Sequence, residues 1–289
     1  MNAVYDMMDA LLPFDFLSFQ FMKNALLAIL LLTPLLGLMG TMAVNQRMAF
    51  FSDALGHSAL TGIGLGIVLG LQSDLVAMLV FGIIWALLIS RIKQTGTTSV
   101  DTIISVFSST SIAMGLVILS RGGGFAKYSS LLIGDVLAVA PKDLLWLLLA
   151  LVIGVGTWML IYNQLLLASI NISLAKSRRI RVRLVEYGFV ILVAVAVMLS
   201  IRWVGVLLIN ALLILPAAAG RNLSRSARSH AFLSVLIAMI SGVAGLVLAF
   251  YWNTSAGAAI VLCAAAFYGI SLLIFSFRRL LTKAGKRKS

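Results

Sequence analysis

The amino-acid sequence predicts an all-α membrane protein, a polytopic helical bundle with about eight to nine transmembrane helices. Hydrophobic residues make up 62% of the 289 residues and charged residues only 11%, whereas a soluble domain carries about 25% charged residues. The apolar residues are gathered in runs of about 18–20, the length that a helix needs to cross a bilayer core. Basic residues lie mainly in the short segments between these runs, as they do in the loops of membrane proteins.

Nine apolar runs are long enough to be considered as spans. In chain order they cover residues 21–43, 54–71, 74–91, 101–120, 142–163, 185–201, 204–220, 231–250 and 256–275. The second and seventh runs are short, and a tilted or partly re-entrant path would accommodate them. Residues 129–139 form a further apolar stretch that is too short to span.

One membrane domain is therefore expected over residues 21–277, between an N-terminal segment (1–20) and a basic cytoplasmic tail (278–289). Along the second run, glycines recur every four residues and predict close packing of that helix against another; these are Gly62, Gly66 and Gly70. The one cysteine, Cys263, lies in an apolar run and is expected to be a buried apolar residue, so a thiolate metal cluster is excluded.

Positive charge sets the expected orientation. With nine spans, the strongly basic segments all fall on one side of the membrane, which the positive-inside rule makes cytoplasmic. These residues are Arg91, Lys93, Lys176, Arg178, Arg179, Arg181, Arg183, Arg221, Arg225, Arg228, Arg278, Arg279, Lys283, Lys286, Arg287 and Lys288. Anionic lipid headgroups are the expected partner of the net charge of +13, and no aromatic-basic module for nucleic acid is present in the sequence.

The N-terminal segment then lies outside, and it carries Asp6, Asp9 and Asp15 in place of the basic start of a cleavable signal, so no such signal is expected. Several cations also fall on the outer side, against the positive-inside rule: Arg121, Lys127 and Lys142. Arg202 and Trp203 are expected at the outer interface, where such side chains serve as anchors.

Ionisable residues at membrane depth are costly and usually functional. The clearest pair is Asp53 and His57, which are four residues apart and therefore share one helix face. A carboxylate oxygen and an imidazole nitrogen suit a borderline divalent cation that takes its other ligands from elsewhere. A structural interpretation competes, in which Ser52 or Asp53 caps the helix and His57 packs against a neighbour. Spacing alone favours the structural interpretation. The other histidine, His230, lies in a basic loop.

Other polar residues near the spans have structural explanations. Asp101 and Asp143 each suit the first turn of a helix. Asp135 either caps a small helix or lines a vestibule. Asn210 and Pro216 interrupt the seventh span, where the proline is expected to kink or end the helix.

Sequence motifs of catalysis and nucleotide binding are missing. The chain has no G-x-x-x-x-G-K-[ST] and therefore no ATPase of its own, and it has no G-x-S-x-G, H-E-x-x-H or C-x-x-C. We expect a transport protein with no catalytic residue and no permanently bound cofactor, and at this point a passive or proton-coupled carrier remains open.

At SDALGHSALTGIGLG the sequence resembles the zinc and manganese ABC permease family, the ABC-3 family. Residues 47–70, RMAFFSDALGHSALTGIGLGIVLG, look like the most distinctive stretch of that family. The likeness continues in order along most of the chain, through DTIISVF (101–107), LLIGDVLAV (131–139), VGVLLINALLILPAAAGR (204–221) and AGAAIVLCAA (256–265).

The resemblance implies the permease subunit of an ABC importer for a divalent transition metal ion, either zinc or one of manganese and iron, in the bacterial plasma (inner) membrane. It also implies a permease homodimer, two cytoplasmic ATPase subunits, and a periplasmic or extracellular protein that delivers the metal. Asp53 and His57 match the family's Asp-x-x-x-His positions, which line the metal path. On this ground, and not on spacing, they are the predicted metal ligands.

One segment departs from the family pattern. After NIS at 171–173 the family continues with Asp-Pro and a Phe-Ala pair, whereas this chain reads LAKSRRIRVRLVEY. This segment is expected to make the coupling contact with the ATPase, which then needs an acidic surface there; alternatively, the basic run only enforces topology and binds anionic lipid. Two rival functions also stay open: an ABC permease for a metal chelate or corrinoid, and a stand-alone secondary carrier or membrane scaffold.

Overall fold

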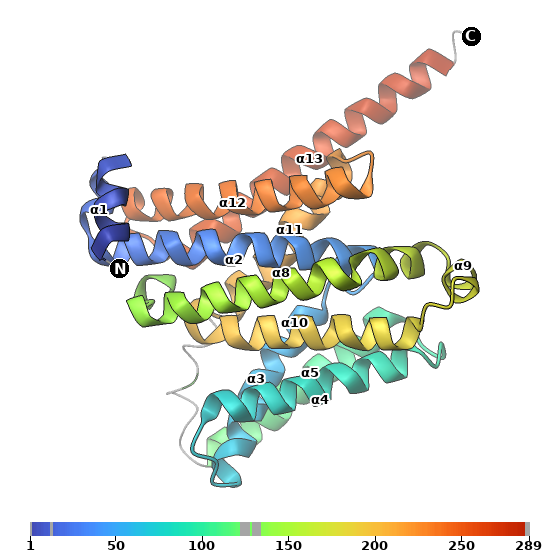
Figure 1. Cartoon of the computed structure of the whole chain (residues 1–289), viewed down its shortest axis with the longest axis horizontal. Helices are drawn as coiled ribbons and strands as arrows, with labels where there is room; N and C mark the ends of the chain where they lie inside the picture. The colour runs from blue at the N-terminus through green and yellow to red at the C-terminus, as the bar shows by residue number, and fades with distance from the viewer. Residues whose placement is uncertain (1, 12–13, 122–127, 129–133, 287–289) are drawn as a thin grey trace.

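The structure, a computed structural model, describes residues 2–11, 14–121, 128 and 134–286, so Lys127 and the first part of the 129–139 stretch lie outside it. The described part is helical without a strand, which confirms the all-α class (Figure 1). Its elements are α1 (Asn2–Leu11), η1 (Asp15–Ser18), α2 (Gln20–Asn45), α3 (Phe51–Val68), α4 (Asp74–Lys93), α5 (Val100–Arg121), η2 (Val136–Ala138), α8 (Pro141–Ile170), α9 (Ile172–Ser177), α10 (Val182–Val204), α11 (Val206–Leu223), α12 (Ala227–Trp252) and α13 (Ala256–Lys286).

Eight of the described helices are long and apolar enough to cross a membrane, namely α2, α4, α5, α8, α10, α11, α12 and α13. The ninth expected span, α3, is a helix of 18 residues that falls outside this set, since its Asp, His, Ser, Thr and Gly residues lower its hydropathy. Most of its residues are buried, and it packs against α4 and α5, so its polar groups are shielded by the bundle.

The basic segments gather at one end of the bundle, as the charge pattern predicts. Figure 1 shows α2, α4, α8 and α13 ending on the side where α10 and α12 begin, and α9 projects beyond that side. α1, η2 and the link between α10 and α11 lie at the opposite end. Below, the two ends are called the basic end and the outer end.

Glycines bring α3 and α4 close together, as predicted for two of the three residues in the repeat. A Cβ atom on Gly66 would lie 2.5 Å from the Cβ atom of Ala77, and one on Gly62 would lie 3.0 Å from the Cα atom of Met78. For Gly70 the prediction of close packing is wrong, because it lies beyond the end of α3 in open space, with φ +69°. Gly70 serves the turn, since glycine adopts that conformation without strain.

Two carboxylates at the outer end, Asp135 and Asp143, bond to the backbone at helix starts. Asp135 accepts a hydrogen bond from the Leu137 amide at 3.0 Å and so caps η2, which decides between the two interpretations of this residue. Asp143 accepts one from the Ala140 amide at 3.1 Å in the first turn of α8. In α11 the helix runs on past Pro216, so of the two expected effects of this proline, ending the helix is ruled out.

Candidate functional site

Asp53 and His57 lie in the first two turns of α3, near the basic end. Asp53 stands in the first turn, where the N-terminus of a helix favours negative charge. The His57 Nε2 atom lies 3.3 Å from Asp53 Oδ1, so the two side chains meet on one helix face. Neither Ser52 nor Asp53 caps α3: the capping position is Phe50, without a side-chain cap. The structural interpretation of Asp53 as a cap therefore lacks its hydrogen bond.

The carboxylate of Asp53 is the meeting point of three helices. Asn210 of α11 donates from Nδ2 to Asp53 Oδ1 at 3.0 Å, and Ser108 of α5 donates from Oγ to Asp53 Oδ2 at 3.3 Å. Sequence reasoning did not include either partner in the site. The available signal was Asn210 itself, an amide within an apolar run, which is a costly residue at membrane depth.

The side-chain carbonyl oxygen of Asn210 is an acceptor that is left without a hydrogen bond at this junction. Its Oδ1 atom is buried and has no hydrogen-bond partner among the described residues. A buried acceptor without a partner loses its hydration without compensation. Amide oxygens are also common ligands of hard divalent cations. Asp53, His57 and Asn210 therefore offer a carboxylate, an imidazole and an amide oxygen within one small region.

A cavity of about 300 Å³ opens beside Asp53. Two carboxylates and three hydroxyl groups contribute to its wall, which is formed by Phe50, Asp53, Asp101, Ile104, Ser105, Ser108 and Ser109. Asp101 stands in the first turn of α5, as expected, and in addition faces this cavity. His57 does not line it. The cavity therefore has a polar wall and gives access to Asp53 but not to His57.

The polar face of α5 lies at the surface of the single chain. Asp101, Ser105 and Ser109 recur at helical spacing and are all exposed. A membrane-spanning helix that turned a carboxylate and hydroxyl groups toward lipid would be unfavourable. This face therefore needs water or another polar surface next to it.

One chain does not provide a complete metal site within its described part. No group of three or more His, Cys, Asp or Glu side chains is placed there to hold a metal ion. His230 has a structural role: it lies in α12 and not in a loop, is 4% exposed, and its Nε2 atom is 2.9 Å from the carbonyl oxygen of Ala217. An ion held by Asp53 and His57 would therefore need further ligands of other kinds, such as the Asn210 amide oxygen or water.

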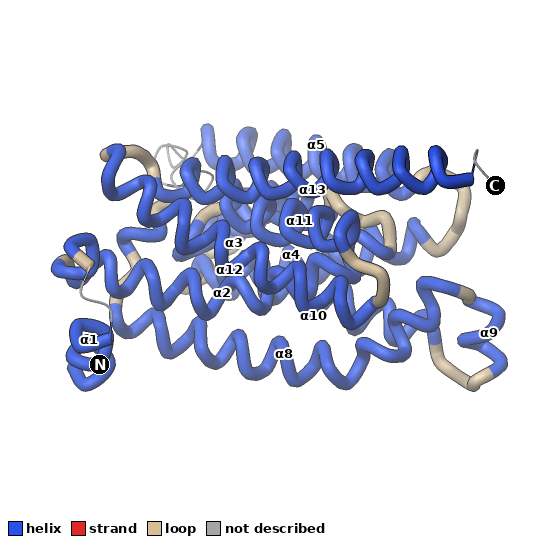
Figure 2. Tube along the Cα trace, turned by 90° about the horizontal axis from the view of Figure 1, so that it is seen from above, coloured by secondary structure: helices blue, strands red, loops and turns tan. Residues whose placement is uncertain are grey.

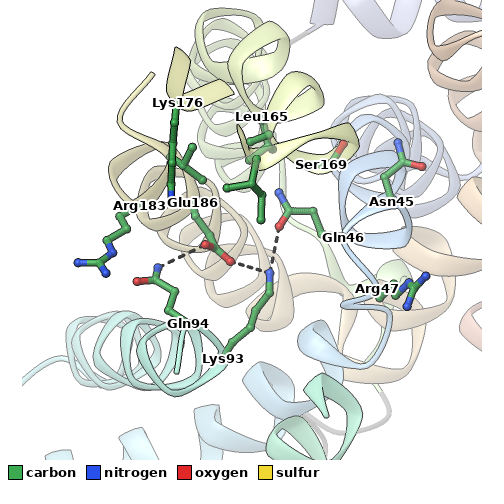
Figure 3. A pocket seen from close by; sticks show the side chains of 13 residues that line it. Asn45, Gln46, Arg47, Lys93, Gln94, Leu165, Ser169, Lys176, Arg183 and Glu186 are labelled. Atoms are coloured by element: carbon green, nitrogen blue, oxygen red, sulfur yellow. Dashed lines mark hydrogen bonds and ion pairs between the residues drawn. The ribbon is translucent and has the colours of Figure 1, made fainter. Parts of the chain in front are cut away.

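A second pocket, of about 540 Å³, lies at the basic end between α2, α4, α8, α9 and α10 (Figure 3). At its centre Lys93 Nζ lies 2.6 Å from Glu186 Oε1 and donates to Gln46 Oε1 at 3.0 Å. Gln94 donates to Glu186 at 3.3 Å. These contacts tie the end of α4 and the start of α10 to the link between α2 and α3. That link leads directly into the turn that carries Asp53.

The chain is similar to known transport proteins over most of its length. A family model described as the ABC 3 transport family matches residues 18–275. The zinc uptake membrane protein ZnuB of Haemophilus influenzae is 29% identical over 255 residues, which cover 88% of this chain and 97% of that protein. The manganese import permease ScaB of Streptococcus parasanguinis is 30% identical over 262 residues, which cover 89% and 91%. A solved structure of PsaBC from Streptococcus pneumoniae in complex with Fab has a TM-score of 0.75 and 29% identity, over 94% of this chain and 95% of that one.

Proposed function

The chain belongs to the ABC 3 transport family, and from that premise we propose the roles of its site and its partners. It is the membrane-spanning permease subunit of an ABC importer for divalent transition metal ions, zinc or manganese. A chelate or corrinoid permease and a stand-alone carrier are not favoured, because the relatives that align over most of the chain are named for zinc uptake and manganese import.

Asp53 and His57 are the ligands that the metal ion meets as it crosses the membrane. The observation that carries this role is the carboxylate of Asp53, which faces a polar cavity while a buried, unpartnered amide oxygen of Asn210 lies at the same junction. Asp53 is 39% and His57 is 23% exposed, so both can still reach an ion. The small cavity suits a bare or partly hydrated cation.

Two copies of the chain complete this site. A structural zinc ion takes four ligands and other divalent ions take six or more, whereas one chain supplies a carboxylate, an imidazole and an amide oxygen. The exposed polar face of α5 beside the cavity would find its complement in the same face of a second copy. Such an isologous arrangement places two Asp53–His57 pairs across a two-fold axis, where an ion path can run.

The permease works in the bacterial plasma membrane with two kinds of partner. Cytoplasmic ATPase subunits hydrolyse ATP, since the sequence has no phosphate-binding loop of its own. A periplasmic or extracellular metal-binding protein delivers the ion at the outer end. The permease itself catalyses no reaction and keeps no cofactor.

The segment α9 makes the contact with the ATPase. It projects beyond the bundle at the basic end, which makes it accessible from the cytoplasm (Figure 1). Its surroundings carry exposed aliphatic side chains, Ile172 and Leu174, next to the exposed cations Lys176, Arg178 and Arg179. Exposed aliphatic groups favour burial by a protein partner, and the cations favour an acidic surface on that partner.

Metal uptake in cells that lack their own importer tests the metal ligands. The variants His57→Ala and Asp53→Asn should each lower uptake of labelled zinc or manganese by more than the roughly 10–100-fold typical of losing a supporting residue, because each removes a ligand itself. The yield of the folded permease should be unchanged, since the amide that replaces the Asp53 carboxylate still offers an oxygen to Asn210.

Asp74→Asn is the matched control for the loss of a carboxylate. Asp74 stands in the first turn of α4 at the outer end and accepts a hydrogen bond from the Tyr128 hydroxyl at 3.1 Å. Uptake in this variant should stay normal. Normal uptake in His57→Ala and Asp53→Asn as well would remove the pair from the ion path.

A further inference from the structure

A groove of about 620 Å³ runs along the bundle between α4, α8 and α10, at the outer end. Figure 2 shows α8 on the side of the bundle opposite α5, so the groove is separate from the polar face beside Asp53. Its wall is mostly aliphatic, and Gly154 and Ala196 lie buried within it. In the membrane this groove faces away from the proposed dimer contact and toward lipid.

Two cations line the mouth of this groove. Lys142 lies in the first turn of α8 and Arg202 in the last turn of α10, and these two helix ends meet at the outer end. Both side chains are exposed, and neither forms an ion pair within the part of the chain that the structure describes. Trp146 and Trp203 line the groove beside them. The positive-inside rule does not explain cations on this side, so they call for another partner.

The length of the groove matches one leaflet of a bilayer. Along α8 it extends from Lys142 to Gly154, which is about 18 Å at about 1.5 Å per residue. Along α10 it extends from Trp203 back to Leu192, or about 17 Å. The hydrocarbon core is about 30 Å thick, so one leaflet contributes about 15 Å. A transmembrane helix of another protein would need a groove about twice as long.

We propose that this groove binds one phospholipid of the outer leaflet, of the phosphatidylethanolamine class. Its phosphate lies between Lys142 and Arg202, and one acyl chain fills the aliphatic part down to Ile153. The volume of about 620 Å³ is in the range of about 300–1,000 Å³ that small-molecule sites occupy. The tryptophans lie at the headgroup level, where their rings prefer to be.

Asp143 selects the amine headgroup. This carboxylate also lines the groove, and its Oδ2 atom accepts the hydrogen bond from the Ala140 amide that starts α8. No hydrogen bond to its Oδ1 atom is found among the described residues. An ionised carboxylate accepts several hydrogen bonds, so Oδ1 can take one from a primary ammonium group. Two cations and one carboxylate thus match a headgroup with one phosphate and one amine.

Native mass spectrometry of the purified full chain tests the proposal, with phosphatidylethanolamine and phosphatidylglycerol of identical acyl chains as probes. The wild-type chain should retain one phosphatidylethanolamine, and more of it than phosphatidylglycerol. The double variant Lys142→Gln/Arg202→Gln should bind it about tenfold more weakly or worse, as expected when charge-assisted contacts to a phosphate are lost. Asp143→Asn, which keeps a capping oxygen, should abolish the preference between the two lipids.

Two further variants keep the test decisive. Arg121→Gln removes a cation from the same end of the bundle but outside the groove, and should leave retention unchanged. Ala150→Phe fills the groove without changing its charge, and should expel the lipid even if the double variant folds poorly. Equal retention by the wild type, the double variant and Ala150→Phe would overturn the proposal. So would a preference for phosphatidylglycerol, or a polypeptide cross-linked from a cysteine placed at Ala150.

Discussion

Removing one partner of the ion pair between Lys93 and Glu186 should cost several times more stability than removing the charge of Asp9 from its pair with Lys23, although both N–O distances are 2.6 Å. The difference lies in burial. Both cations are largely buried, with Lys93 at 16% and Lys23 at 10% exposed, but the carboxylate of Glu186 is 13% exposed whereas that of Asp9 is 55% exposed and is reached by water. Lys93 also donates to Gln46, so its charge sits in a bonded network inside the basic-end pocket (Figure 3).

The expected magnitudes follow from this burial. Removing one partner of a buried pair costs about 3–5 kcal/mol, because the other charge stays buried and uncompensated. Glu186→Gln should therefore lower the free energy of unfolding by about 3 kcal/mol. Asp9→Asn should cost less than about 1 kcal/mol, since water screens the exposed carboxylate and the amide that replaces it still offers an oxygen to Lys23. The double variant Lys93→Met/Glu186→Met removes both charges and should recover about 2 kcal/mol of the loss, because apolar replacements of a buried pair are often tolerated.

Thermal unfolding in detergent measures all four proteins under the same conditions. At about 2–4 °C per kcal/mol, Glu186→Gln should lower the midpoint by roughly 6–12 °C, and Asp9→Asn by no more than a few degrees. The double variant should unfold well above Glu186→Gln. Equal shifts for Glu186→Gln and Asp9→Asn would refute the reasoning from burial, and a double variant no more stable than Glu186→Gln would refute the expected recovery.

Three further predictions concern packing, the ion path and coupling. Gly40→Ala should prevent normal folding, because the added Cβ atom would overlap the backbone of α11. Gly156→Ala should instead raise the unfolding midpoint slightly, because position 156 has open space and alanine is about 1 kcal/mol more favourable than glycine in a helix. Thermal scans in detergent compare the two variants. Asn210→Asp should retain more metal in the purified permease yet slow uptake, because a second carboxylate holds the ion longer; metal analysis showing no gain would contradict this. Arg178→Glu with Arg179→Glu should weaken assembly with the ATPase, as measured by co-purification, and binding by the unchanged chain should fall as salt rises.

The apolar runs predicted the helices because length and hydropathy are local properties of the sequence. For α3 hydropathy was a weaker guide. Its apolar run was recognised in the sequence, but its polar residues keep it out of the set of candidate spans, and only the fold shows that neighbouring helices bury it. Gly70 shows the limit of a repeat pattern. The four-residue spacing continued past the end of α3, and only the backbone shows that Gly70 serves a turn.

The predicted ligands came from resemblance, and their surroundings came from the fold. Asn210 and Ser108 reach Asp53 from helices that are far along the chain, so no spacing rule brings them together. The one carboxylate of α5, Asp101, was interpreted from the sequence as a first-turn residue. Asp101 is such a residue and also lines the cavity, so one local explanation concealed a second role.

The place of Asp53 in the first turn of α3 limits how firmly the proposed site can hold a cation. The N-terminus of a helix carries about half a positive charge, which opposes a metal ion and offsets about half of the carboxylate's charge. In the proposed dimer, two such carboxylates would together present roughly one negative charge to a divalent ion. A structural zinc site of four protein ligands binds with about 10–16 kcal/mol, and such a site would trap the ion. A pair of weakened carboxylates with imidazoles and amide oxygens suits passage instead, because an ion that replaces part of its hydration there can still leave.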